Sequence, residues 1–345
     1  MSAALQFELP PQLEAREPPE ASGLGRDDVR LLVASKRNRR IEHARFPELP
    51  KFLASGDVVV VNTSATIPAA VPAELPDGSP VELRVSTPAP HRPAERWWIV
   101  ELRAGGRVFD AGRAGDAVSL PGGGRAELVA PYAGGRRLWL ACLDFPQPLL
   151  DYLAVHGHPI RYGYVPREWP IDAYQNVYAR EPGSAEMPSA GRPFTAELVT
   201  ELVARGIHVA PLTLHTGVSS PERGEPPYPE RFRVPAATAR LVNAVHGWGG
   251  RVIAVGTTVV RALETVAQPT GAVAPGEGWT NLVVGRDHGL HAVDGLLTGW
   301  HEPAASHLEL LGAVADEELL DRCYGEALEH GYLWHEFGDS HLILP

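Results

Sequence analysis

The sequence predicts an α/β protein in which a mainly parallel sheet is interrupted by an inserted antiparallel β-barrel domain. Three observations support this fold class. A short β-branched run at residues 58–61 is typical of a buried strand. Residues 70–150 consist of short apolar or alternating segments separated by glycine-rich turns, and the later residues alternate between strand and helix patterns. We therefore expect an α/β body over residues 1–69 and 151–345 and a barrel-like insert at 70–150.

The N-terminal segment is rich in proline and charged residues, and residues 1–30 are expected to be mostly extended. Residues 26–51 hold eight basic side chains against four acidic ones, the only clearly basic stretch of the sequence. Two interpretations of this stretch stay open. It is either the solvated face of a hairpin or helix, or a surface that contacts phosphate groups.

The insert is predicted from strands at residues 81–85 and 97–102, which alternate or run apolar. Glycine runs at 105–106, 122–124 and 134–135 separate such segments. Because these runs lie between strands, hairpin turns explain them better than a nucleotide-binding loop.

Helical patterns begin after the insert. Thr195 is a good N-cap and Gly206 a good C-terminal stop for a helix between them. A C-terminal helical region is expected at 304–333 and a last strand at 341–344. Between these, the pattern predicts a strand at 207–214, a helix at 235–246, a strand at 251–255 and a helix at 259–266.

Composition excludes several functional classes. The 345 residues suggest about two domains, and 31 basic against 42 acidic side chains give a net charge of −11. Two cysteines are too few for an all-cysteine zinc site or an iron–sulfur cluster, and they rule out a disulfide framework. The expected compartment is therefore the reducing cytoplasm.

Local sequence argues against three further classes. Neither of the two lysines, Lys36 and Lys51, follows a glycine, so the chain has no P-loop. No apolar run reaches about 18 residues, so no membrane-spanning helix is expected. The first twenty residues lack the charged-then-apolar layout of a secretory signal.

The most informative local motif is the junction at Gly256, Thr257 and Thr258, where a predicted strand passes into a helix. Free N–H groups and the helix dipole attract a carboxylate or phosphate at such a junction, and Arg261 follows one turn later. An ordinary capped strand-to-helix turn is the structural alternative.

Two other motifs are weaker. The small-residue loop around Ser189 and Gly191 runs into the helix capped by Thr195 and permits close approach of a ligand, but such loops also serve as connectors. His215, followed by Gly217, ends a predicted strand at the edge of a parallel sheet where ligands bind, but a lone histidine is more often structural.

Histidine is concentrated near the C-terminus, where seven of the 14 histidines lie between residues 288 and 341. His301 is followed by Glu302, but the next histidine, His307, is not on the same helical face. The zinc-binding helix motif with two histidines four residues apart is therefore missing, and we predict no metal site.

The combined motifs resemble the S-adenosylmethionine:tRNA ribosyltransferase-isomerase family of queuosine biosynthesis, over nearly the whole chain. The individual matches are weak, but their order along the chain is specific. They comprise Gly56-Asp57, Tyr174-Gln175, Pro188 to Thr195, Leu214-His215 with Gly217, Arg251 to Glu264, Gly278-Trp279-Thr280, Val293-Asp294-Gly295-Leu296, His301 with Pro303, and Phe337-Gly338-Asp339.

The resemblance implies an α/β body with an inserted barrel and a transferase reaction. The ribosyl part of S-adenosylmethionine would move to 7-aminomethyl-7-deazaguanine in tRNA and isomerise to give epoxyqueuosine, while adenine and methionine leave. No prosthetic group is implied, because S-adenosylmethionine is a substrate. The protein is expected to be a cytoplasmic monomer without membrane contact.

The residue roles follow from this chemistry. A sulfonium acidifies the adjacent ribose carbon, so a base such as His215, or else His301, could remove a proton there. The methionine carboxylate needs hydrogen-bond donors. The expected substrate-binding residues are Ser189, Gly191, Thr195, Gly217, Gly256, Thr257, Thr258, Arg261 and Asp294.

Departures from the family pattern keep a second function open. Family arginines are replaced by Ala65 and Ala70, a histidine by Pro193, and the segments at 219–224 and 227–231 lack the usual residues. Residues 301–345 also hold ten acids and one arginine, which is unfavourable for RNA. The alternatives are a paralogue that uses S-adenosylmethionine on a small-molecule acceptor, and a non-catalytic descendant.

Overall fold

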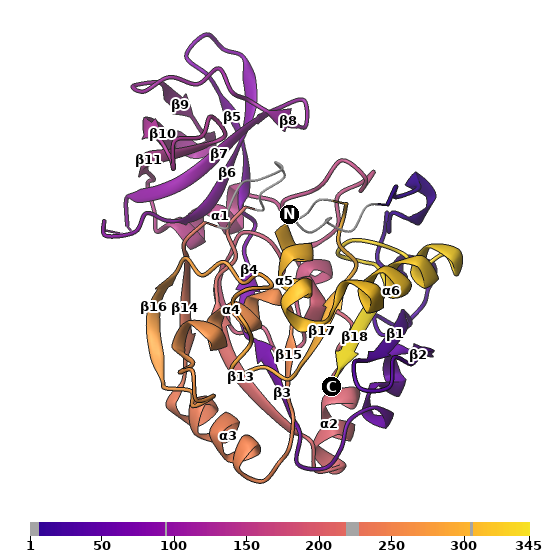
Figure 1. Cartoon of the computed structure of the whole chain (residues 1–345). Helices are drawn as coiled ribbons and strands as arrows, with labels where there is room; N and C mark the ends of the chain where they lie inside the picture. The colour runs from indigo at the N-terminus through magenta and orange to yellow at the C-terminus, as the bar shows by residue number, and fades with distance from the viewer. Residues whose placement is uncertain (1–6, 94, 219–227, 304–305) are drawn as a thin grey trace.

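A nine-stranded mixed sheet and a closed antiparallel barrel make up the computed structural model, which describes residues 7–93, 95–218, 228–303 and 306–345 (Figure 1). The predicted fold class is confirmed. Within the described ranges, none of the helices has the length and apolar character needed to cross a membrane.

Parallel pairing is concentrated in the middle of the large sheet. The neighbours β13, β3, β15 and β17 are parallel, as are β18 and β1, whereas the remaining pairs are antiparallel, so the sheet is mixed. Its order is β16 (Gly276–Thr280), β14 (Glu230–Val234), β13 (His208–Leu214), β3 (Val58–Asn62), β15 (Val252–Val255), β17 (Gly295–Gly299), β18 (Ser340–Leu344), β1 (Arg30–Ser35) and β2 (Ile41–Arg45).

Helices cover both faces of this sheet because successive strand side chains point to opposite sides. Val58 and Val60 pack into the core beneath α3 (Ala236–Gly247), α4 (Thr257–Val266), α5 (Ser306–Val314) and α6 (Glu317–Glu329). Val59 and Val61 face the opposite core, which contains side chains of α2 (Ala196–Ala204) and the 3₁₀ helix η3 (Phe46–Lys51).

The barrel is closed by pairing of its last strand with β7. Its strands are β5 (Ala70–Glu74), β6 (Pro80–Pro88), β7 (Trp97–Ala104), β8 (Arg107–Val108), β9 (Ala117–Ser119), β10 (Arg125–Pro131) and β11 (Leu138–Asp144). The helix α1 (Leu149–His156) packs Tyr152 and Leu153 into the barrel core, and the Tyr152 hydroxyl donates to the carbonyl oxygen of Pro121 at 2.6 Å. The chain returns to the body through α1, which rests on the barrel.

The body elements after the insert lie close to their predicted positions. Thr195 caps α2 by accepting a hydrogen bond from the Leu198 amide at 3.1 Å, and Gly206 has the left-handed φ of +74° expected at a helix end. The predicted helix at 259–266 begins two residues earlier, at Thr257. The C-terminal helical region is divided into α5 and α6 by Asp316, which caps α6, and residues 304–305 of that region lie outside the described part of the chain.

The basic stretch forms the β1–β2 hairpin and η3, and two of its arginines pair with acids from the C-terminal segment. Arg30 contacts Asp339 at 2.7 Å, and Arg39 contacts Asp316 at 2.5 Å and Glu318 at 3.3 Å. The acidic C-terminal segment is thus partly neutralised by the hairpin beside it. The same pairing occupies side chains that would otherwise be available to phosphate groups.

Candidate functional site

A cavity of about 370 Å³ lies at the carboxyl ends of β13, β15 and β17, where the sheet meets the barrel. Ligands bind at this edge in open α/β sheets because the loops that follow the strands diverge there. Barrel residues Ser86 and Thr87 of β6 line one side of the cavity. Of the predicted site residues, the cavity lining contains Ser189, Gly217, Gly256, Thr257, Thr258, Arg261 and His301.

The strand-to-helix junction after β15 forms one wall of the cavity. Gly256 has a φ of +91°, and a Cβ there would lie 3.4 Å from the Cβ of Ala190, so glycine permits both the turn and the close contact. The first N–H groups of a helix have no acceptor within the helix. Together with the hydroxyl groups of Thr257 and Thr258 they give this wall donors suited to an anion.

Arg261 is held within the wall by the protein itself. Its guanidinium forms an ion pair with Glu230 and donates from Nε to the carbonyl oxygen of Leu282 at 3.0 Å. The other carboxylate oxygen of Glu230 accepts a hydrogen bond from the Gly217 amide at 3.0 Å. Arg261 therefore joins α4 to the segment after β13, and its charge is already balanced by Glu230.

His301 lies just after β17, the strand that pairs with β15. Its Nε2 is 2.9 Å from the hydroxyl of Thr298, and its ring stacks on His307 with centroids 4.7 Å apart. Burial, assisted by the neighbouring histidines, lowers the pKa of His301 well below its usual value. The imidazole is therefore uncharged at neutral pH and able to accept a proton.

Acidic side chains also line the cavity, namely those of Glu186, Glu302 and Glu336. The Tyr164 hydroxyl donates to Oε2 of Glu336 at 2.6 Å. Burial raises the pKa of Glu336 to about 7, and the nearby carboxylates Glu186 and Glu302 add to this effect. Sequence reasoning missed Glu336, although it directly precedes the Phe337-Gly338-Asp339 motif.

Three stacked aromatic side chains, those of Tyr162, Tyr164 and His335, lie beside these acids. The rings of Tyr162 and Tyr164 are almost parallel, with centroids 5.6 Å apart. His335 stacks on the other ring of the pair, Tyr164, at 3.8 Å. All three residues line the cavity, so they offer a platform for a planar heterocycle.

His215 is not part of the cavity lining. Its Nδ1 is 2.7 Å from the hydroxyl of Ser64, which in turn lies 2.6 Å from the hydroxyl of Ser184. These serines belong to β4 (Ser64–Thr66) and β12 (Glu181–Ser184), a separate parallel pair of strands. Burial lowers the pKa of His215. Through these contacts His215 helps to pack the end of β13 against β4 and β12.

Three predicted binding residues also lie away from the cavity lining. A Cβ on Gly191 would come within 1.9 Å of the Tyr178 hydroxyl, so close packing explains this glycine. Thr195 is occupied as the cap of α2. The carboxylate of Asp294 accepts from the Val252 amide at 2.8 Å at the amino end of β15, the opposite end of the sheet from Gly256.

The family departures are only partly covered by the structure. Residues 219–224 and 227 lie outside its described part. Ala65 lies in β4, and Ala70 begins β5 in the barrel. Neither alanine lines the cavity.

Comparison with known proteins identifies related sequences over the full length. A family model described as a queuosine biosynthesis protein matches residues 2–343. A Moorella thermoacetica protein named S-adenosylmethionine:tRNA ribosyltransferase-isomerase is 37% identical, with 98% of each chain covered. Proteins of the same name from Symbiobacterium thermophilum and Thermus thermophilus are 36% and 35% identical, with 98% and 99% of this chain covered.

A solved structure shows the same fold. The crystal structure of an S-adenosylmethionine tRNA ribosyltransferase from Thermotoga maritima matches with a TM-score of 0.54 and 28% identity, covering 99% of both chains. Together, the matches over the whole length confirm the resemblance that the ordered motifs indicated. The chain belongs to the family of queuosine biosynthesis proteins that includes these S-adenosylmethionine:tRNA ribosyltransferase-isomerases.

Proposed function

We propose that the chain transfers and isomerises the ribosyl group of S-adenosylmethionine onto 7-aminomethyl-7-deazaguanine in tRNA, giving epoxyqueuosine and releasing adenine and methionine. Membership of the family over residues 2–343 is the observation that carries this proposal. The cavity at the sheet edge supports it because it combines an anion-binding helix end, acidic groups and a stacking platform.

The donor substrate matches these features by charge and shape. The methionine carboxylate suits the helix end at Thr257 and Thr258, whose donors are not used within α4. The sulfonium and the acceptor amine are cations, and the carboxylates of Glu186, Glu302 and Glu336 favour cations in the cavity. The planar rings of adenine and the deazaguanine suit the platform of parallel aromatic rings.

Proton transfer is assigned to two groups with different environments. His301, kept uncharged by burial, accepts the proton from the ribose carbon next to the sulfonium. Glu336, with a pKa of about 7, accepts a proton from the incoming amine. Both side chains line the cavity, whereas His215 does not.

The function predicts adenine release that depends on the modified RNA. Purified protein incubated with S-adenosylmethionine should release adenine and methionine only when tRNA containing 7-aminomethyl-7-deazaguanine is added. Binding of the tRNA should weaken at least about tenfold between about 50 and about 200 mM salt. The measurement is chromatography of adenine and methionine, with unmodified tRNA as the matched control.

Other outcomes of this assay contradict the proposal in different ways. Turnover without RNA would identify a paralogue with a small-molecule acceptor. No adenine under any condition, from protein that binds S-adenosylmethionine, would identify a non-catalytic descendant.

The titration of Glu336 predicts a pH dependence of activity. The carboxylate form is needed to accept a proton, so kcat/KM should fall about tenfold per unit as pH drops below about 7, where the group becomes protonated. In Glu336→Gln, activity should be lower by about 10²-fold and this acid limb should be lost. Single-turnover rates between pH 5.5 and pH 9, scanned at about half-unit steps, measure both effects. A variant that retains the acid limb would assign it to another group.

A cytoplasmic location and a monomeric state are part of the same proposal. The tRNA acceptor is present in the cytoplasm, and the two thiols, Cys142 and Cys323, are free in the structure. Sedimentation of the purified protein with and without tRNA tests the monomeric state.

A further inference from the structure

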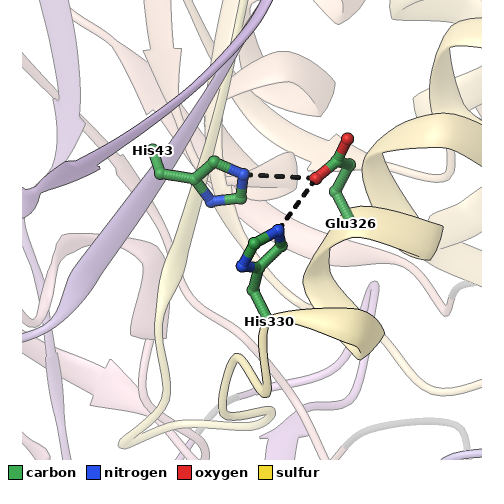
Figure 2. Close-up of side chains that lie close together, drawn as sticks. All are labelled: His43, Glu326 and His330. Carbon is green, nitrogen blue, oxygen red and sulfur yellow. Dashed lines mark hydrogen bonds and ion pairs between the residues drawn. The ribbon is translucent and has the colours of Figure 1, made fainter.

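A group of three metal-ligating side chains lies outside the cavity, between the edge strand β2 and the last turn of α6. The Nε2 atoms of His43 and His330 are 3.3 Å and 3.2 Å from the same oxygen, Oε2 of Glu326 (Figure 2). The three donor atoms all lie within 4.8 Å of one another. None of these residues lines the cavity described above.

The fold brings the three side chains together from distant parts of the sequence. Glu326 and His330 are four residues apart at the end of α6, so they lie on one face of the helix. His43 comes from β2, whose partner β1 packs against α6. The two imidazole rings have centroids 4.4 Å apart, and Figure 2 shows both rings directed at the carboxylate.

The donor spacing fits a four-coordinate ion. Zinc binds imidazole nitrogen at about 2.0–2.1 Å and carboxylate oxygen at about 2.0–2.2 Å, which places tetrahedral ligands about 3.3 Å apart. Both nitrogen–oxygen distances, 3.3 Å and 3.2 Å, agree with this separation. Two imidazoles and one carboxylate favour zinc or a similar transition metal over magnesium or calcium, which prefer oxygen ligands.

A second layer of contacts orients His43. Its Nδ1 is 2.8 Å from the hydroxyl of Tyr332, and the Arg30 guanidinium lies 4.4 Å from the centroid of the Tyr332 ring. A tyrosine hydroxyl can either donate or accept a hydrogen bond. When it accepts from Nδ1–H, the Nε2 lone pair of His43 is left for a metal, which is the usual arrangement of a metal-binding histidine. The nearby positive charge of Arg30 is balanced by Asp339 at 2.7 Å.

We propose that His43, Glu326 and His330 form a binding site for a divalent transition metal of the zinc type, with water in the remaining position. The metal replaces the protons that now join the imidazoles to Glu326, and it fastens β2 to the end of α6. The three side chains are 37%, 39% and 53% exposed, so an ion reaches them directly from solvent. The sequence predicted no metal site because His43 lies far along the chain from the other two residues.

Zinc binding to tag-free, chelator-treated full-length protein tests the proposal. Competition against a chromophoric chelator should give one zinc ion per chain in the wild type. Glu326→Gln and His43→Ala should each weaken binding at least about tenfold, the usual cost of losing a ligand contact or its support. His208→Ala removes an exposed histidine outside the group and should leave binding unchanged. Cobalt as a spectroscopic probe should show a four-coordinate spectrum in the wild type and in His208→Ala, but not in Glu326→Gln or His43→Ala.

Stability and activity separate this site from the catalytic cavity. Zinc should raise the melting temperature of the wild type and not that of Glu326→Gln, because a ligand that binds only the folded state stabilises it. Adenine release should be the same for the two proteins. Equal zinc affinity in the wild type and both variants, or no binding by correctly folded wild type at tens of micromolar zinc, would overturn the proposal.

Discussion

Replacing His301 with alanine is expected to slow adenine release by about 10²- to 10⁴-fold, the range that a positioned proton-transfer group contributes. His301 lines the cavity, and burial keeps its imidazole uncharged at neutral pH. Single-turnover release of adenine with saturating S-adenosylmethionine and modified tRNA measures the effect. Circular dichroism and the melting temperature of the variant show whether the loss arises from unfolding.

His215→Ala is the matched comparison, since it removes a histidine of similar burial outside the cavity lining. Its loss of the hydrogen bond to Ser64 should cost about 1 kcal/mol of stability and slow adenine release less than about tenfold. A large loss of activity for His215→Ala together with wild-type activity for His301→Ala would reverse the assignment.

Thr298→Val tests how His301 is oriented. The Thr298 hydroxyl is 2.9 Å from Nε2, and as an acceptor from Nε2–H it leaves the Nδ1 lone pair free for substrate. Valine keeps the shape of the side chain and removes this acceptor. We expect a slower chemical step with little change in KM, because the substituted residue acts through His301.

The arrangement of the body was predictable because its signals are local. The run Val58–Val61 is buried on both sides as β3, and Thr195 and Gly206 stand at the ends of α2 as the capping preferences indicate. The antiparallel pairs within the sheet were harder to predict from the sequence. The antiparallel pairs of β14 with β13 and of β18 with β17 are settled by tertiary packing, which leaves no periodic signal in the sequence.

The candidate site was predictable where a motif coincides with the end of a strand. Gly256 to Thr258 follow the predicted strand β15, so strand direction alone places them at the ligand-binding edge. His301 follows β17, a strand that the sequence pattern did not indicate. Asp294 and His215 belong to equally clear motifs, but one lies at the amino end of its strand and the other contacts Ser64 away from the cavity. Resemblance to a family does not distinguish residues that hold the fold from residues that face a ligand.

The effect of the C-terminal acids depends on where they lie in the fold, which a count of charges along the sequence does not show. The ten acids of residues 301–345 suggested poor compatibility with RNA. The structure pairs Asp316, Glu318 and Asp339 with arginines of the N-terminal hairpin. A tertiary contact between the two ends of the chain therefore removes part of that objection.

The largest effect on stability is expected at Glu101, in β7 of the barrel. Its carboxylate is fully buried and lies within 4 Å of three guanidinium groups, those of Arg84 at 3.7 Å, Arg103 at 3.0 Å and Arg137 at 2.9 Å. Replacing Glu101 with alanine leaves these cations without their central anion. The free energy of unfolding should fall by about 3–5 kcal/mol, as for other buried ion pairs that lose one partner.

Urea unfolding followed by tryptophan fluorescence measures this loss, since Trp97, Trp98 and Trp139 all lie in barrel strands. Glu127→Ala is the control, because Glu127 is an exposed acid on strand β10 of the same barrel. It should change the free energy of unfolding by no more than about 0.5 kcal/mol. A similar small change for Glu101→Ala would show that the arginines do not depend on this carboxylate.

Glu101→Gln separates charge from volume at the same position. Glutamine nearly restores the shape of the side chain and keeps an oxygen acceptor, but it does not balance the charges of Arg84 and Arg137, which are 5% and 2% exposed. If packing dominates, glutamine should recover most of the stability lost in Glu101→Ala. We expect it to recover only a small part, because the cost lies in desolvated cations, and the loss should persist at high salt, since buried charges are screened much less than exposed ones.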